Sequence, residues 1–257
     1  MAPTNDQFYL PFGKELAANE KKNRDKAVRS LKRYLSVGGG DLSEADLFKL
    51  WKGLFYCFWM SDKPLVQQAL ANDLGALILD VPEDNVIPFI TAFWKVHCAE
   101  WHGLDRIRLD KYLLLFRRVI FYSFAWLANN DWDEEKINAY TECLLEGPLH
   151  PTDRTKPDAI VYHILEVYLE ELEKVIDAVL NDKDTDPDNL PEVPTDDLMR
   201  PIIVLSTDAL NKTTRNKAKA IISQYEASDD EDEEGLENAL DDEAMEEDSD
   251  DMEDDSE

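Results

Sequence analysis

Two groups of residues in this sequence have spacings that could support chemistry, and each has a simpler explanation. Cys98 and His102 are four residues apart, so on a helix they would share one face and could bind a metal ion. No second pair of ligands at a supporting spacing accompanies them. Paired carboxylates can do acid and base work, and one acidic series repeats at helical spacing: Glu166, Glu170, Glu173 and Asp177. Such a series is typical of a solvated helix face.

Other catalytic signatures are missing from the sequence. It contains no G-x-x-x-x-G-K-[ST] loop, and the glycine triplet at 38–40 precedes Asp41, whose charge would repel a phosphate. His97, His150 and His163 are scattered, and no serine or cysteine has the setting of an activated nucleophile. We therefore expect no enzymatic activity, no metal and no cofactor.

Helical periodicity dominates the chain, and alternating strand patterns are scarce. The pattern predicts nine helices, at residues 14–36, 43–60, 63–79, 83–101, 106–129, 133–146, 158–181, 196–206 and 208–225. Ser43, with Asp46 three residues later, resembles a capping box. Ser61 or Asp62 is expected to cap the helix that begins near Pro64.

The stretch KLWKGLFYCFWM, residues 49–60, is apolar around more than half of its helical circumference. A helix of this kind packs on both faces, and residues 107–127 have the same character. A chain of stacked helix pairs explains two such helices better than a single four-helix bundle does. We therefore predict an all-α, HEAT-like α-solenoid in which Trp51 and Trp59 belong to the core, although a ligand pocket lined by these rings remains an alternative.

Charge is unevenly distributed along the 257 residues, whose formal net charge is −29. Residues 226–257 contain 20 acidic and no basic residues, so the first 225 residues have a net charge of only −9. A segment of this composition cannot bury enough apolar surface to fold, and it should attract basic proteins. Four regions are predicted: a helical-repeat domain (1–181), a Pro/Asp-rich linker or arm (182–197), C-terminal helices (198–225) and a disordered acidic tail (226–257).

Compartment signals favour a reducing, non-membrane environment. The three cysteines are far apart in the sequence, which does not suggest a disulfide framework or a zinc knuckle. No stretch approaches the roughly 18 apolar residues that span a bilayer, and the first residues lack the pattern of a secretory signal. The tail also places Ser228 before three acidic residues, a context that favours phosphorylation by an acidophilic kinase.

Three basic clusters stand out in this acidic protein. The first helix aligns Lys22, Lys26, Arg29 and Arg33 opposite its apolar side, while Glu20 and Arg24 are expected to pair with each other or with the next helix. The other clusters are Arg106, Arg108 and Lys111, and Lys212, Arg215 and Lys219. Basic clusters in an acidic chain favour contact with phosphates of an RNA backbone, without base-specific recognition. A solubilising surface, or contacts to acidic protein partners, remains the alternative.

Several stretches resemble the nucleolar ribosomal RNA processing protein 1 family of large-subunit assembly factors. They are NRDKAVRSLKRYL (23–35), LFKLWKGLFYCFWMSDKPLVQQALA (47–71), AEWHGLDRIRLDKYLLLFRRVI (99–120), HPTDR (150–154) and ILEVYLEELEKV (164–175). The resemblance covers roughly residues 8–180. It implies a nuclear, nucleolar, non-enzymatic scaffold of pre-60S particles that is needed for rRNA processing. It also implies partners among assembly factors, including a β-propeller protein and a Brix-domain protein.

Two functional hypotheses follow. The first is a structural assembly factor that holds pre-rRNA and assembly factors in place. The second is a protein-only helical adaptor, or an acidic chaperone for basic ribosomal proteins. A nuclease is a more distant possibility, because metal-dependent cleavage would need ligands that the sequence does not group together.

Overall fold

The computed structural model describes residues 13–37, 42–181 and 193–227, and the regular elements in these ranges are helices. They are α1 (Gly13–Leu16), α2 (Lys21–Ser36), α3 (Glu44–Trp59), α4 (Pro64–Ala76), the 3-10 helix η1 (Leu77–Asp80), α5 (Glu83–Glu100), the 3-10 helix η2 (Trp101–Gly103), α6 (Arg106–Ala128), α7 (Glu134–Glu146), α8 (Asp158–Leu180) and α9 (Thr195–Asp208). A last helix occupies residues 212–227.

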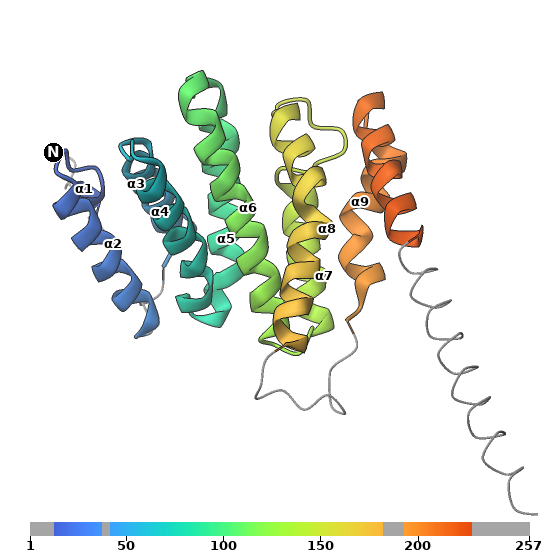
Figure 1. Cartoon of the computed structure of the whole chain (residues 1–257), viewed down its shortest axis with the longest axis horizontal. Helices are drawn as coiled ribbons and strands as arrows, with labels where there is room; N and C mark the ends of the chain where they lie inside the picture. Colours follow the sequence, from blue (N-terminus) through green and yellow to red (C-terminus); the bar gives the residue numbers. More distant parts are fainter. Residues whose placement is uncertain (1–12, 38–41, 182–192, 228–257) are drawn as a thin grey trace, which may run out of the picture.

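The helices stack in two layers, which confirms the predicted all-α solenoid. One layer contains α3, α5, α7 and α9, and the other contains α2, α4, α6, α8 and the last helix (Figure 1). Neighbours within a layer pack along each other, as α4 does along α6, α6 along α8 and α3 along α5. Consecutive helices run in opposite directions between the layers. Turns therefore alternate between an upper edge, where α2, α4, α6, α8 and the last helix begin, and a lower edge, where α3, α5, α7 and α9 begin.

The aromatic stretch on α3 is part of the core between these layers. Trp51 is 1 % exposed, and its indole N–H donates to the carbonyl of Phe89 at 2.9 Å. Its ring centroid lies 4.8 Å from that of Phe93 on α5, and the ring centroids of Phe55 and Tyr112 of α6 are 4.9 Å apart. The interpretation of this stretch as architectural is confirmed for Trp51. Trp59 is only partly buried, so the prediction that its side chain belongs to the core overstated its burial.

Close packing of α4 on α6 depends on one glycine. A Cβ atom added to Gly75 would lie 2.8 Å from Cδ2 of Tyr122 and 3.1 Å from the backbone of Arg118. The absent side chain lets the two helices of the same layer approach.

The predictions for the helix ends were partly correct. Ser43 caps α3 by accepting from the backbone N–H of Asp46 at 3.2 Å, as the capping box predicts. The cap expected of Ser61 or Asp62 is wrong, because α4 begins after Lys63 without a side-chain cap. The predicted helix at 14–36 is also interrupted between α1 and α2, where the backbone of Glu20 is extended.

The C-terminal helices join the solenoid. The Tyr168 hydroxyl of α8 donates to the carbonyl of Leu198 on α9 at 2.7 Å, and Arg200 pairs with Glu142 of α7 at 2.7 Å. Asn211 donates to the Tyr162 hydroxyl at 2.9 Å, so the start of the last helix is also fixed to α8. Residues 182–192 and 228–257 lie outside the described residues, and the division into four regions stays a prediction.

A buried histidine should make the fold sensitive to acid. His97 is 1 % exposed, its Nδ1–H donates to the carbonyl of Phe93 at 2.8 Å, and burial lowers its pKa to about 3. The unfolded chain takes up this proton below pH 6.5 but the folded chain does not, so the stabilisation is complete above pH 6.5 and is lost as the pH falls toward 3.

We expect the wild type to lose about 2 kcal/mol of unfolding free energy between pH 7 and pH 5, relative to His97→Phe, at ~1.4 kcal/mol per pH unit below the unfolded pKa. Urea unfolding of both proteins at the two pH values measures this difference. The same gap at both pH values would contradict a neutral buried imidazole.

Candidate nucleic-acid interface

The basic series on α2 is exposed along its whole length. We name Lys22, Lys26, Arg29 and Arg33 the α2 strip. All four side chains are exposed, and none forms an ion pair or hydrogen bond within the described residues. Their positions follow from the helix pattern, because Ala27, Val28, Leu31 and Leu35 occupy the buried side. The α2 strip therefore offers four cations to a ligand without breaking an internal contact.

Arg24 belongs to the structure and not to the α2 strip. It is 7 % exposed, and its guanidinium donates to the carbonyls of Ala18 at 2.9 Å and Asn19 at 2.7 Å. A third bond of 3.2 Å reaches the carbonyl of Met60. Of the two expectations for this residue, contact with the next helix is the one observed.

The second predicted cluster divides into one exposed cation and two structural ones. Arg106 is exposed and has no polar partner within the described residues. Arg108 pairs with Asp105, stacks on the Trp59 ring at 4.6 Å and donates to the Trp59 carbonyl at 3.3 Å. The Arg108 side chain is thus largely occupied by contacts within the protein.

Lys111 is a correction to the sequence-based interpretation. It is 4 % exposed, and its ammonium donates to the carbonyls of Phe58 and Trp59 at 2.8 Å and of Ser61 at 2.7 Å. These carbonyls lie at the end of α3, where helical partners are lacking. Burial lowers the pKa of Lys111 to about 8. A buried side chain with three internal acceptors does not meet RNA, so we omit Lys111 from the candidate interface.

The third cluster divides into two exposed cations and one structural one. Lys212 and Lys219 are exposed. Arg215 is partly buried and donates to the carbonyls of Ala209 at 2.5 Å and Leu210 at 3.1 Å, which fixes the turn after α9. The predicted phosphorylation site, Ser228, lies outside the described residues.

The structure brings together cations that the sequence separates. One exposed lysine or arginine stands near the start of each helix at the upper edge, and we name this set the basic edge: Lys22, Lys63, Arg106, Arg154 and Lys212. None of these five side chains has a polar partner within the described residues. Lys63 and Arg154 were not anticipated. Neither belongs to a basic series on one helix, and only the repeated position shortly before or within the first turn of a helix could have indicated them.

The lower edge has the opposite charge. Each helix that begins there has two acidic residues in its first turn: Glu44 and Asp46, Glu83 and Asp84, Glu134 and Glu135, and Asp196 and Asp197. At the upper edge, α2, α4 and α6 have none, and α8 has only Asp158. Acidic residues near helix N-termini are stabilising, so the lower edge follows ordinary helix electrostatics. First-turn acidic residues are therefore concentrated at the lower edge, while the cations of the basic edge stand beside the exposed Glu20, Asp62 and Asp158.

The candidate catalytic groups are not assembled into a site. Within the described ranges, no group of three or more His, Cys, Asp or Glu residues could hold a metal ion. Glu166, Glu170, Glu173 and Asp177 are exposed, as a solvated face requires. Glu171, between them, is the buried member, and it accepts from Arg117 at 2.5 Å and Lys174 at 2.7 Å. Burial raises the pKa of the thiols of Cys57, Cys98 and Cys143 to about 11, which opposes nucleophilic use.

The fold and these surfaces define a helical-repeat protein of the kind that binds partners along extended faces. Residues 8–257 match the family model described as "Nucleolar protein, Nop52", and the chain belongs to this family. The expected relationship to rRNA processing protein 1 is confirmed, and the nucleolar nature of the family agrees with the expected location. No helix among the described residues is long and apolar enough to cross a membrane.

Three relatives show how far the similarity extends. The chain is 40 % identical over 180 residues to ribosomal RNA processing protein 1 homolog B of Homo sapiens, an alignment that covers 68 % of this chain and 24 % of the relative. Homolog A of Homo sapiens is 38 % identical over 172 residues (65 % and 37 %), and the Drosophila melanogaster homolog is 32 % identical over 164 residues (62 % and 24 %). The aligned region thus corresponds to 24–37 % of the length of these relatives.

Proposed function

We propose that this protein is a non-catalytic scaffold of nucleolar pre-60S particles, required for rRNA processing and assembly of the large ribosomal subunit. Family membership supports the role in rRNA processing, because the relatives are named for it. The observation that carries the scaffold role is the α2 strip, whose four exposed cations have no partner among the residues that the structure describes, on an otherwise acidic chain. Cations of this kind bind phosphates in a manner that is independent of base sequence.

The proposed partners are of two kinds. The α2 strip contacts the phosphate backbone of pre-rRNA, while other faces of the solenoid bind assembly factors, including a β-propeller protein and a Brix-domain protein. Solenoids suit this division because neighbouring repeats form a long surface with room for several ligands. Lys219, one of the two exposed cations of the third predicted cluster, is a second candidate for RNA contact.

Charge reversal of the α2 strip tests the proposal in cells. We expect the variant with Glu at Lys22, Lys26, Arg29 and Arg33 to fold normally, because all four side chains are solvated. Its cosedimentation with large-subunit precursors should fall severalfold, with accumulation of precursor rRNA, because four phosphate contacts become repulsive. Sucrose-gradient profiles and RNA blots measure both effects.

A matched control distinguishes the effect of where the charge is reversed from the effect of how much the net charge changes. Lys26→Glu/Arg29→Glu and Lys49→Glu/Lys95→Glu change the net charge equally, but Lys49 and Lys95 lie on α3 and α5, where they pair with Asp46 and Glu44. Such surface pairs contribute about 0–1 kcal/mol each. Only the first double variant should impair incorporation. Normal assembly of the fourfold variant would show that the α2 strip is merely solvated surface.

A protein-only adaptor, or an acidic chaperone for basic ribosomal proteins, is the second candidate function. The 20 acidic residues of 226–257 favour it, since a segment of this charge attracts basic chains. Under this alternative, reversal of the α2 strip leaves RNA binding unchanged and removes one protein neighbour from nuclease-treated particles.

A further inference from the structure

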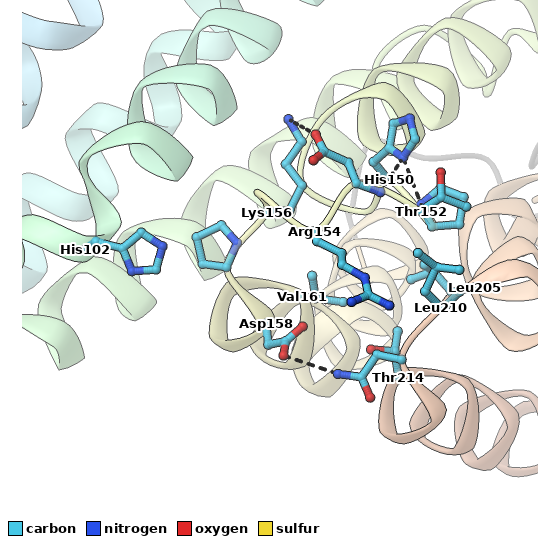
Figure 2. Close-up of a pocket in the computed structure, with 15 residues that line it drawn as sticks. His102, His150, Thr152, Arg154, Lys156, Asp158, Val161, Leu205, Leu210 and Thr214 are labelled. Atoms are coloured by element: carbon cyan, nitrogen blue, oxygen red, sulfur yellow. Dashed lines mark hydrogen bonds and ion pairs between the residues drawn. The ribbon is translucent and has the colours of Figure 1, made fainter.

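A pocket of about 500 Å³ opens at the upper edge, near the C-terminal end of the solenoid. Its walls come from the loop between α7 and α8, the first turn of α8, the end of α9 and the start of the last helix (Figure 2). Val161, Leu205 and Leu210 provide aliphatic surface within it. The pocket belongs to the solenoid itself, because the Leu210 N–H donates to the Pro151 carbonyl at 3.0 Å across it.

Two side-chain donors of this pocket, those of Arg154 and Thr214, have no acceptor within the described residues. The Arg154 guanidinium extends toward Val161 and Leu205 and has no partner within the described residues (Figure 2). Thr214 is 4 % exposed, and its hydroxyl also makes no hydrogen bond within those residues. His150 accepts at Nδ1 from the backbone N–H groups of Thr152 and Asp153, at 3.3 and 3.1 Å, so in the neutral ring its proton is on Nε2.

The acidic groups of the pocket, in contrast, are already engaged. Asp153 accepts from the backbone and hydroxyl of Thr155, at 2.8 and 2.7 Å, and pairs with Lys156 at 3.6 Å. Asp158 accepts from Asn211 at 3.2 Å. Neither carboxylate pairs with Arg154, which is therefore the cation of the pocket that can accept an anionic partner, and it lies beside aliphatic side chains.

Aliphatic side chains accompany the free cations along the same edge. Ile107, next to Arg106, is 91 % exposed, and Leu65, two residues after Lys63, is 80 % exposed. Leu210, at the pocket and two residues before Lys212, is 51 % exposed. A nucleic-acid backbone would use the cations but gains nothing from leucine and isoleucine, since unpaired bases prefer to stack on aromatic or arginine side chains. A polypeptide with alternating acidic and apolar residues would use both.

We propose that the basic edge and its pocket bind an extended acidic peptide segment of an assembly-factor partner, with one carboxylate on Arg154 and an adjacent apolar side chain against Val161, Leu205 and Leu210. This inference rests on the proposed scaffold role, and it assigns to the part of the basic edge from Lys63 to Lys212 a protein partner distinct from the RNA on the α2 strip, to which Lys22 belongs. Arginine recognises a carboxylate through two parallel hydrogen bonds, which fixes the register of the peptide. The free cations Arg106 and Lys63 would contact further acidic residues of the same peptide in the direction of α2.

Site-specific photocrosslinking in native pre-60S particles tests this proposal with the full chain. A benzophenone amino acid replaces Leu210 or Ile107 at the basic edge, and Leu180, which is 55 % exposed at the lower end of α8, serves as the control position. We expect the Leu210 and Ile107 probes to crosslink one protein through a segment of alternating acidic and apolar residues, identified by mass spectrometry. The Leu180 probe should not capture that segment.

Variants at the pocket test whether the crosslink depends on the guanidinium of Arg154. Arg154→Glu should lower the Leu210 crosslink yield about tenfold or more, and Arg154→Lys should lower it less, because lysine retains charge without the planar fork. Arg29→Glu on the α2 strip should leave the yield unchanged. Crosslinks from Leu210 to RNA, to the chain's own residues 228–257 or to nothing, in particles that contain the protein, would overturn the proposal. Loss of RNA binding by the α2 variants alone would leave this assignment standing.

Discussion

Replacement of Trp51 by alanine should destabilise the protein by about 3–5 kcal/mol, since it removes a fully buried indole and leaves a cavity between α3 and α5. The variant also loses the hydrogen bond from the indole N–H to the Phe89 carbonyl. Unfolding in urea, followed by circular dichroism, measures the change.

Trp59→Ala is the matched control on the same helix. This ring is partly exposed and supports Arg108 by stacking, so its removal should cost only about 1–2 kcal/mol. Equal losses for both variants would show that burial does not determine the role of the aromatic stretch. A wild-type transition for Trp51→Ala would reopen its interpretation as a ligand-binding surface.

Lys111→Met should cost about 3 kcal/mol, although it preserves most of the side-chain volume. Three carbonyls near the end of α3 lose their donor, and a buried acceptor without a partner costs about 1–3 kcal/mol. Arg106→Ala, at the first residue of the same helix, should change stability by less than about 0.5 kcal/mol, because Arg106 is exposed. Comparable unfolding curves for the two variants would contradict the structural role of Lys111.

Lys111 also illustrates what sequence reasoning could and could not provide. Helix positions, the buried side of α2 and the core position of Trp51 follow from spacing within one helix, so they were predictable. Lys111 follows Arg106 and Arg108 at helical spacing and looks like part of a surface cluster. Its burial depends on where α6 crosses the end of α3, which no local pattern encodes.

The basic edge could not be recognised from the sequence for a related reason. Lys63 and Arg154 belong to different helix pairs, and neither is part of a basic series along one helix. A search for charge along individual helices finds the α2 strip but not a set that is built from one residue per repeat. Glu171 shows the converse, because its buried ion pairs cannot be distinguished in sequence from the exposed acidic residues beside it.

Salt dependence of RNA binding by the full chain most directly tests the claim that the α2 strip contacts pre-rRNA phosphates. Affinity for pre-rRNA fragments is measured over a series of salt concentrations, for the wild type and for the fourfold Glu variant. Removal of four phosphate contacts should flatten the slope of log affinity against log salt by about three to four units, and equally for RNAs of unrelated sequence. An unchanged slope and affinity in the variant would contradict the account.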